Sequence, residues 1–118
     1  MRRKERDLIQ IDRDISTAGK SFLGLYMEYV LTLIEEGFNQ HDIIDKLHSI
    51  QVGFSDKDRE GTRVRVNALF RIVQAEKVLY SLQAVLDSPK KLSKGAKDKA
   101  RETIDKINSG EIELPNLR

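Results

Sequence analysis

The sequence contains no cysteine. This absence excludes disulfides, thiolate metal sites and a cysteine nucleophile, and it fits a reducing compartment. The sequence also lacks an apolar run long enough for a bilayer, because residues 21–34 fall short of the roughly 20 apolar residues that a spanning helix needs. The charged start MRRKERD has no uninterrupted apolar segment behind it, so no secretory signal peptide is predicted. We therefore expect a soluble, cytoplasmic protein.

A large net charge is absent as well, and the formal value of +2 is too small to indicate a partner. The distribution of charge is uneven, however. Residues 35–60 hold seven acidic and three basic side chains, whereas residues 88–101 hold six basic side chains and one acidic. The composition, 39% hydrophobic and 34% charged, is typical of a globular protein with exposed charged helix faces. We expect a single helical domain over residues 1–110 and a flexible C-terminal tail over residues 111–118.

The most informative segment is residues 21–34, SFLGLYMEYVLTLI, in which apolar side chains point in nearly every direction around a helix. Such a helix must be buried on more than one side, either by other helices of the chain or by a second copy. Apolar residues spaced alternately by three and four positions predict that it belongs to one long helix, over about residues 4–36, ended by Gly37. Residues 16–19 favour caps and turns, so they are its weakest point and the place for a kink or break.

Three further helices are predicted. The first covers residues 39–49 and the last residues 93–108. Between them, a helix over residues 55–87 opens with a capping box at Ser55, although a β-hairpin over residues 50–66 competes with its beginning. We therefore predict an all-α fold. In this small helical bundle, a long antiparallel hairpin has a short helix at its turn and a fourth, C-terminal helix packed across it.

The apolar surface of the first long helix is wider than such a hairpin covers. We therefore predict a homodimer whose interface is formed by Phe22, Leu25, Tyr26 and Tyr29. A compact monomer in which the first helix is fully buried is the alternative.

No pattern in the sequence amounts to a catalytic site, and we expect neither an enzyme nor a cofactor. The Gly-Lys-Ser sequence at residues 19–21 ends like a phosphate-binding P-loop, but the full pattern needs glycine where Asp14 stands. His41, Asp45 and His48 share one helix face and include zinc-ligand types. That face is the solvent side of its helix, so we expect no metal there.

Two basic segments indicate a nucleic-acid partner. Residues 37–65 resemble a helix-turn-helix in outline, with a short apolar helix followed by a capped helix that carries basic residues in its early turns. We expect Arg59, Arg63 and Arg65 to lie near base edges or phosphates. Five lysines of the second segment are candidates for contacts with backbone phosphates: Lys90, Lys91, Lys94, Lys97 and Lys99.

Together these features predict a small non-enzymatic helical protein that binds DNA, or acts as a regulatory module, as a dimer. The alternative is a protein–protein interaction module, such as an inhibitor, an immunity-type protein or an adaptor. Its contact surface would be the acidic segment 35–60 and exposed aromatic side chains of the first helix.

Overall fold

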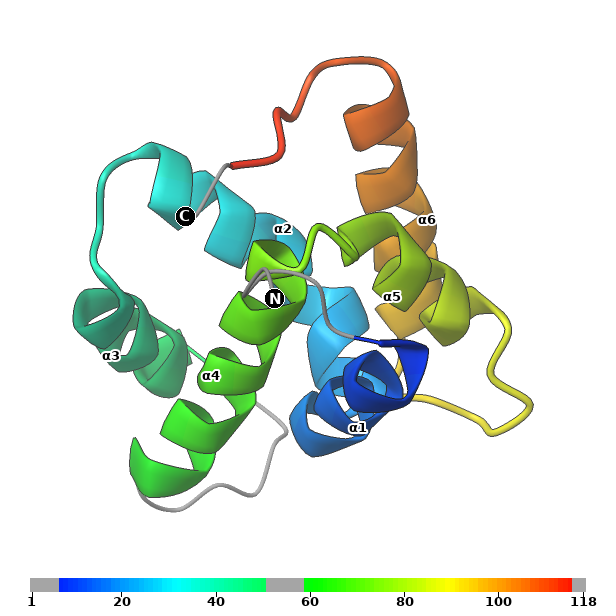
Figure 1. Ribbon diagram of the computed structural model, residues 1–118, viewed down its shortest axis with the longest axis horizontal. Helices are drawn as coiled ribbons and strands as arrows, with labels where there is room; N and C mark the ends of the chain where they lie inside the picture. The colour runs from blue at the N-terminus through cyan, green and yellow to red at the C-terminus, as the bar shows by residue number, and fades with distance from the viewer. Residues whose placement is uncertain (1–6, 51–58, 116–118) are drawn as a thin grey trace.

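The computed structural model describes residues 7–50 and 59–115, which form six α-helices and no strand (Figure 1). The helices are α1 (Leu8–Ala18), α2 (Lys20–Glu35), α3 (Gln40–Ile50), α4 (Arg59–Gln74), α5 (Val78–Leu86) and α6 (Ala96–Asn108). The prediction of an all-α helical bundle is confirmed, but the predicted count of four helices is wrong. Both predicted long helices are broken, so the long hairpin is not confirmed.

The first break separates α1 from α2 at Gly19, whose φ of 86° and ψ of 133° lie outside the helical region. A glycine adopts such angles without the steric cost that a Cβ would add. The N–H of Gly19 still donates to the carbonyl of Ile15 at 2.8 Å, which closes the last turn of α1. The single helix predicted over residues 4–36 is therefore wrong, and the break lies in residues 16–19, the segment that the sequence marked as its weakest point.

The second break, between α4 and α5, is a Schellman motif built on a residue other than glycine. The N–H of Lys77 donates to the carbonyl of Ile72 at 3.1 Å, and the N–H of Glu76 donates to that of Val73 at 3.0 Å. Glu76 is left-handed, with a φ of 59°. This position is usually glycine or asparagine, so the sequence carries no signal for the break and the continuous helix predicted over residues 55–87 is wrong.

Residues 51–58 lie outside the described residues, and with them the predicted capping box at Ser55. The second arm of the competing hairpin, residues 62–66, lies within α4.

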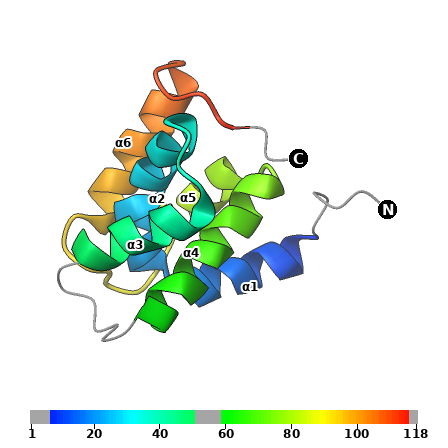
Figure 2. The ribbon, with the colours of Figure 1, turned by 90° about the vertical axis from the view of Figure 1, so that its left-hand side faces the viewer.

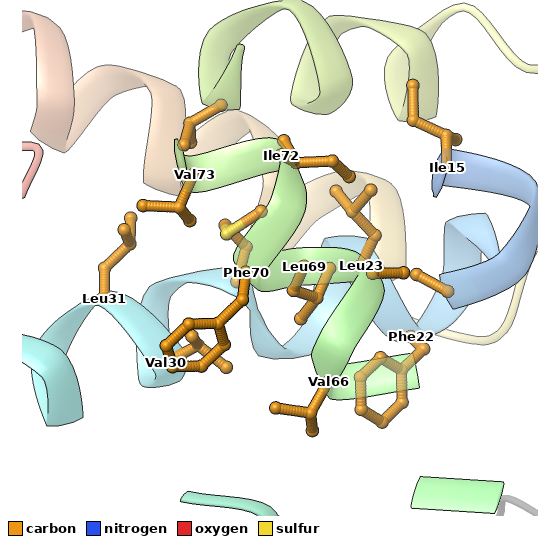
Figure 3. Close-up of a cluster of buried hydrophobic side chains, with 14 of the residues drawn as sticks. Ile15, Phe22, Leu23, Val30, Leu31, Val66, Leu69, Phe70, Ile72 and Val73 are labelled. Carbon is orange, nitrogen blue, oxygen red and sulfur yellow. The ribbon is translucent and has the colours of Figure 1, made fainter. Parts of the chain in front are cut away.

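The helix at the centre of the packing is α2, which contacts α1, α4, α5 and α6 (Figure 2). Phe22, Leu23 and Val30 are fully buried, and Figure 3 shows them gathered with α4 side chains such as Val66 and Leu69. The apolar side chains that surround α2 are thus covered largely by the same chain. This is the arrangement that the sequence analysis gave as the alternative to a dimer.

Gly24 brings α2 close to the ends of two other helices. A Cβ at this position would lie 2.7 Å from the carbonyl oxygen of Ala96 and 3.1 Å from Cγ1 of Val85. Val85 is near the end of α5 and Ala96 begins α6. Close contact at Gly24 therefore holds both ends of the connection between α5 and α6 against α2.

The remaining helix ends follow local signals. The side chain of Asn39 caps α3, since its Oδ1 accepts the N–H of Asp42 at 2.8 Å. The last helix begins at Ala96, not at residue 93 as predicted, because Gly95 is left-handed with a φ of 84°. This helix ends at Asn108 as predicted, and Gly110 just beyond it is left-handed with a φ of 85°. Lys94 and the residues before it therefore lie in a loop.

Candidate nucleic-acid interface

Arg59, the first residue of α4, is held by α3. Its guanidinium contacts the carboxylate of Asp45, and its Nη2 lies 3.0 Å from Nδ1 of His41. The hydrogen bond from Arg59 holds the pKa of Asp45 below its ordinary value. The guanidinium therefore links the start of α4 to α3.

The other two arginines predicted to contact DNA also have partners within the chain. Nε of Arg63 donates to Oε1 of Glu60, one turn earlier, at 3.0 Å. Nη1 of Arg65 donates to the carbonyl of Ala18 at 2.7 Å, and its guanidinium lies over the ring of Phe22, 5.7 Å from the centroid. A cation that binds a carbonyl at a helix C-terminus stabilises that end. These contacts favour structural roles over contacts with bases.

Lys99 belongs to a charged cluster between α2 and α6. Its Nζ lies 3.0 Å from Oε1 of Glu28 and 3.1 Å from Oε1 of Glu102. Nζ of Lys106 lies 3.0 Å from Oε2 of Glu28. Burial disfavours the charged form of Glu28, but hydrogen bonds from Lys106 and Lys99 outweigh it and hold the pKa of Glu28 below its ordinary value. Carboxylates therefore neutralise the charge of Lys99 within the fold.

Residues 88–95, which we call the lysine loop, connect α5 to α6 (yellow in Figure 1). Ser88 is buried at its first end, and Leu92 packs against the core in its middle. The N–H of Ser93 donates to Oγ of Ser21 on α2 at 2.9 Å. These contacts anchor the loop, so its exposed side chains project from a fixed backbone.

Lys90, Lys91 and Lys94 are exposed on this loop. Within the described ranges, none of the three forms an ion pair with a carboxylate of the chain. They line a shallow depression in the surface together with Lys97, whose Nζ donates to the carbonyl of Ser88 at 2.8 Å. The structure therefore brings together four of the eight basic residues that the sequence proposed, and of these four Lys97 is the one whose ammonium group is hydrogen-bonded to the described part of the chain.

The electrostatic surroundings of the loop are mostly positive. Asp98 is the one acidic side chain among the described residues that line the depression, and its Oδ1 lies 3.5 Å from Nη1 of Arg101. The N-terminus of α6 follows the loop directly, and that of α2 reaches it through Ser21. Helix N-termini carry a partial positive charge, which adds to the potential of the lysines.

Sequence reasoning identified these lysines but missed the residues that anchor them. Ser21 and Ser93 are 72 positions apart in the chain, and no local pattern relates them. The burial of Ser88 and Leu92 also depends on the packing of α5 and α6. Pro89 is the local signal that a loop begins here, because a proline just after the helix cannot continue it.

The histidine face of α3 is already occupied by side chains of α4. Nδ1 of His48 lies 3.0 Å from Oγ1 of Thr62, and Arg59 contacts both His41 and Asp45. Across residues 7–50 and 59–115, no group of three or more histidine, aspartate or glutamate side chains is placed to hold a metal ion.

Comparison with protein-family models, with curated proteins and with solved structures found no match for this chain. Any function must therefore be argued from the site itself. None of the helices in the described part of the chain is long and apolar enough to cross a bilayer.

The four residues predicted to form a dimer interface differ in accessibility. Phe22 is fully buried within the single chain, whereas Leu25, Tyr26 and Tyr29 are half-buried. The homodimer stays a prediction, since no contact with a second copy tests it. Helices of the same chain cover most of the apolar surface of α2, which favours the compact monomer that the sequence analysis gave as the alternative.

Proposed function

We propose that this protein binds nucleic acid through the lysine loop, with its ammonium groups on backbone phosphates. The observation that carries the proposal is the contrast among its basic residues. Lys90, Lys91 and Lys94 are exposed and have no ion-pair partner among the described residues. Arg59, Arg65 and the other predicted candidates instead contact groups of the chain.

An anchored loop suits this role for two reasons. Lysine ammonium groups without carboxylate partners keep their full charge for a polyanion, and contact with phosphates releases condensed counterions. The contacts of Leu92 and Ser93 hold the backbone in place before any ligand binds. Less conformational entropy is therefore lost on binding than with a disordered basic tail.

The proposed interface is smaller than the one predicted from the sequence. It rests on three lysines and needs no helix in the major groove, since the early turns of α4 pack against α3 and contact the end of α1. It also needs no second copy of the chain.

Fluorescence anisotropy at low salt tests the proposal with a labelled 20-base-pair duplex. The variant Lys90→Gln/Lys91→Gln/Lys94→Gln should bind at least about tenfold more weakly than the natural protein, because each lost phosphate contact lowers the affinity. Circular dichroism should give the same helix content for both.

A control variant removes the same number of positive charges elsewhere: Lys46→Gln/Arg63→Gln/Lys77→Gln. It should bind within about threefold of the natural protein. Equal losses in the two variants would show that only net charge matters. The absence of any binding to DNA or RNA would end the proposal and leave the protein–protein interaction module as the function to test.

A further inference from the structure

We infer that the nucleic acid bound by the lysine loop is a duplex, held by about three phosphates and without regard to base sequence. This inference rests on the proposed function and names the ligand of the same site. It follows from the lysines on the loop and from the lack, among its described neighbours, of the aromatic and base-reading side chains that other ligands would need.

The loop offers no surface on which bases could stack. Proteins that bind single strands place aromatic rings beside a positive groove. Among the described residues, no aromatic side chain lines the depression at the lysine loop. Of the exposed rings, Phe38 lies under Nζ of Lys46, and the hydroxyl of Tyr80 donates to Oδ1 of Asp12. In the described part of the chain, no aromatic ring beside the loop therefore favours an unpaired strand.

The loop also lacks the side chains that read base edges best. Bidentate recognition uses the arginine fork or the amides of asparagine and glutamine, and residues 88–95, SPKKLSKG, contain none of these. Lysine acts as a point charge that binds any phosphate equally. The three arginines that the sequence predicted near base edges lie on α4 and are engaged with Asp45, Glu60 and the end of α1. Nη1 of Arg101, on α6, lies 3.5 Å from Oδ1 of Asp98.

Charge density then favours a duplex over a single strand. Double-stranded DNA carries about one negative charge per 1.7 Å of axis, and the salt dependence of binding follows the number of phosphates neutralised, with a slope of about −0.9 per contact. Three lysines predict a slope near −2.7, which is roughly a 40-fold loss of affinity between 50 and 200 mM salt. All eight basic residues proposed from sequence would give a slope near −7 and a loss of roughly 20,000-fold.

The test is a salt titration by fluorescence anisotropy with three labelled probes. Two are 20-base-pair duplexes of unrelated sequence, and the third is a 20-nucleotide oligothymidine single strand. The natural protein should bind the two duplexes within about threefold of each other and the single strand several-fold more weakly, with a duplex slope between about −2 and −3.5. The triple lysine variant should show a slope near zero.

Three results would overturn the inference while leaving the proposed function intact: tighter binding to the single strand, a preference above about tenfold between the duplexes, or a slope steeper than about −5. The absence of binding to all three probes would overturn the proposed function as well.

Discussion

Replacement of Gly24 by alanine should destabilise the fold, although alanine is the better helix former. In an open helix position the exchange stabilises by about 1 kcal/mol. Here the new Cβ would lie 2.7 Å from the carbonyl oxygen of Ala96, which is backbone of the first turn of α6 and cannot rotate away. Overpacking of this kind costs about 1–3 kcal/mol, with the upper end expected for a backbone contact.

The net loss should therefore be about 1–2 kcal/mol, which corresponds to a fall in Tm of several degrees for a domain of this size. Thermal and urea unfolding followed by circular dichroism measure it. Thr32→Ala, at an exposed position of the same helix, is the control and should change stability by at most about 0.5 kcal/mol in the favourable direction. A Gly24→Ala protein as stable as the natural one would refute the close contact between α2 and α6, and with it the support of the lysine loop.

Three further outcomes follow from the fold. Glu76→Gly should raise the free energy of unfolding by about 1 kcal/mol, because Glu76 is left-handed. Gly37→Ala, at a φ of 94°, should lower it by a similar amount. Denaturant unfolding of both variants checks that the two changes in stability have opposite signs. Glu28→Gln should cost about 1–2 kcal/mol at neutral pH by removing the partner of Lys99 and Lys106. Because the pKa of Glu28 is lower in the folded state than the ordinary 4.5, its stabilising effect is present above that pH and lost as pH falls below it, so unfolding curves of the two proteins should converge in acid. Sedimentation at micromolar concentration should give a species of 13.5 kDa, because the same chain covers α2, and a stable species of twice that mass would restore the predicted dimer.

Local patterns in the sequence predicted much of the secondary structure. Apolar periodicity indicated helices throughout, and the predicted start of a helix at residue 39 and the predicted end of the last helix at residue 108 agree with the structure. The break at Gly19 falls in the segment 16–19, where the sequence indicated a kink or break, whereas no signal in the sequence marked the break at Glu76. Apolar spacing continues through both, and a glutamate in a left-handed Schellman position contradicts the usual residue preference.

The sequence predicted the basic region that contains the candidate site, but not which of its lysines are available to a ligand. Composition marked residues 88–101 as basic, but which lysines remain available depends on contacts made far away in the sequence. Lys99 meets Glu28 from another helix, and Lys94 is accessible because α6 begins late, after Gly95. Likewise, Arg65 binds the carbonyl of Ala18, 47 positions earlier, which no local motif reveals.

An NMR titration of the isotope-labelled protein with a duplex tests the central claim most directly, because it reports where the ligand binds. Amide signals of the lysine loop and of the neighbouring first turns of α2 and α6 should shift progressively with duplex concentration. Signals of the early turns of α4, around Arg59, Arg63 and Arg65, should stay in place. Shifts centred on those turns of α4, with the lysine loop unchanged, would contradict the account.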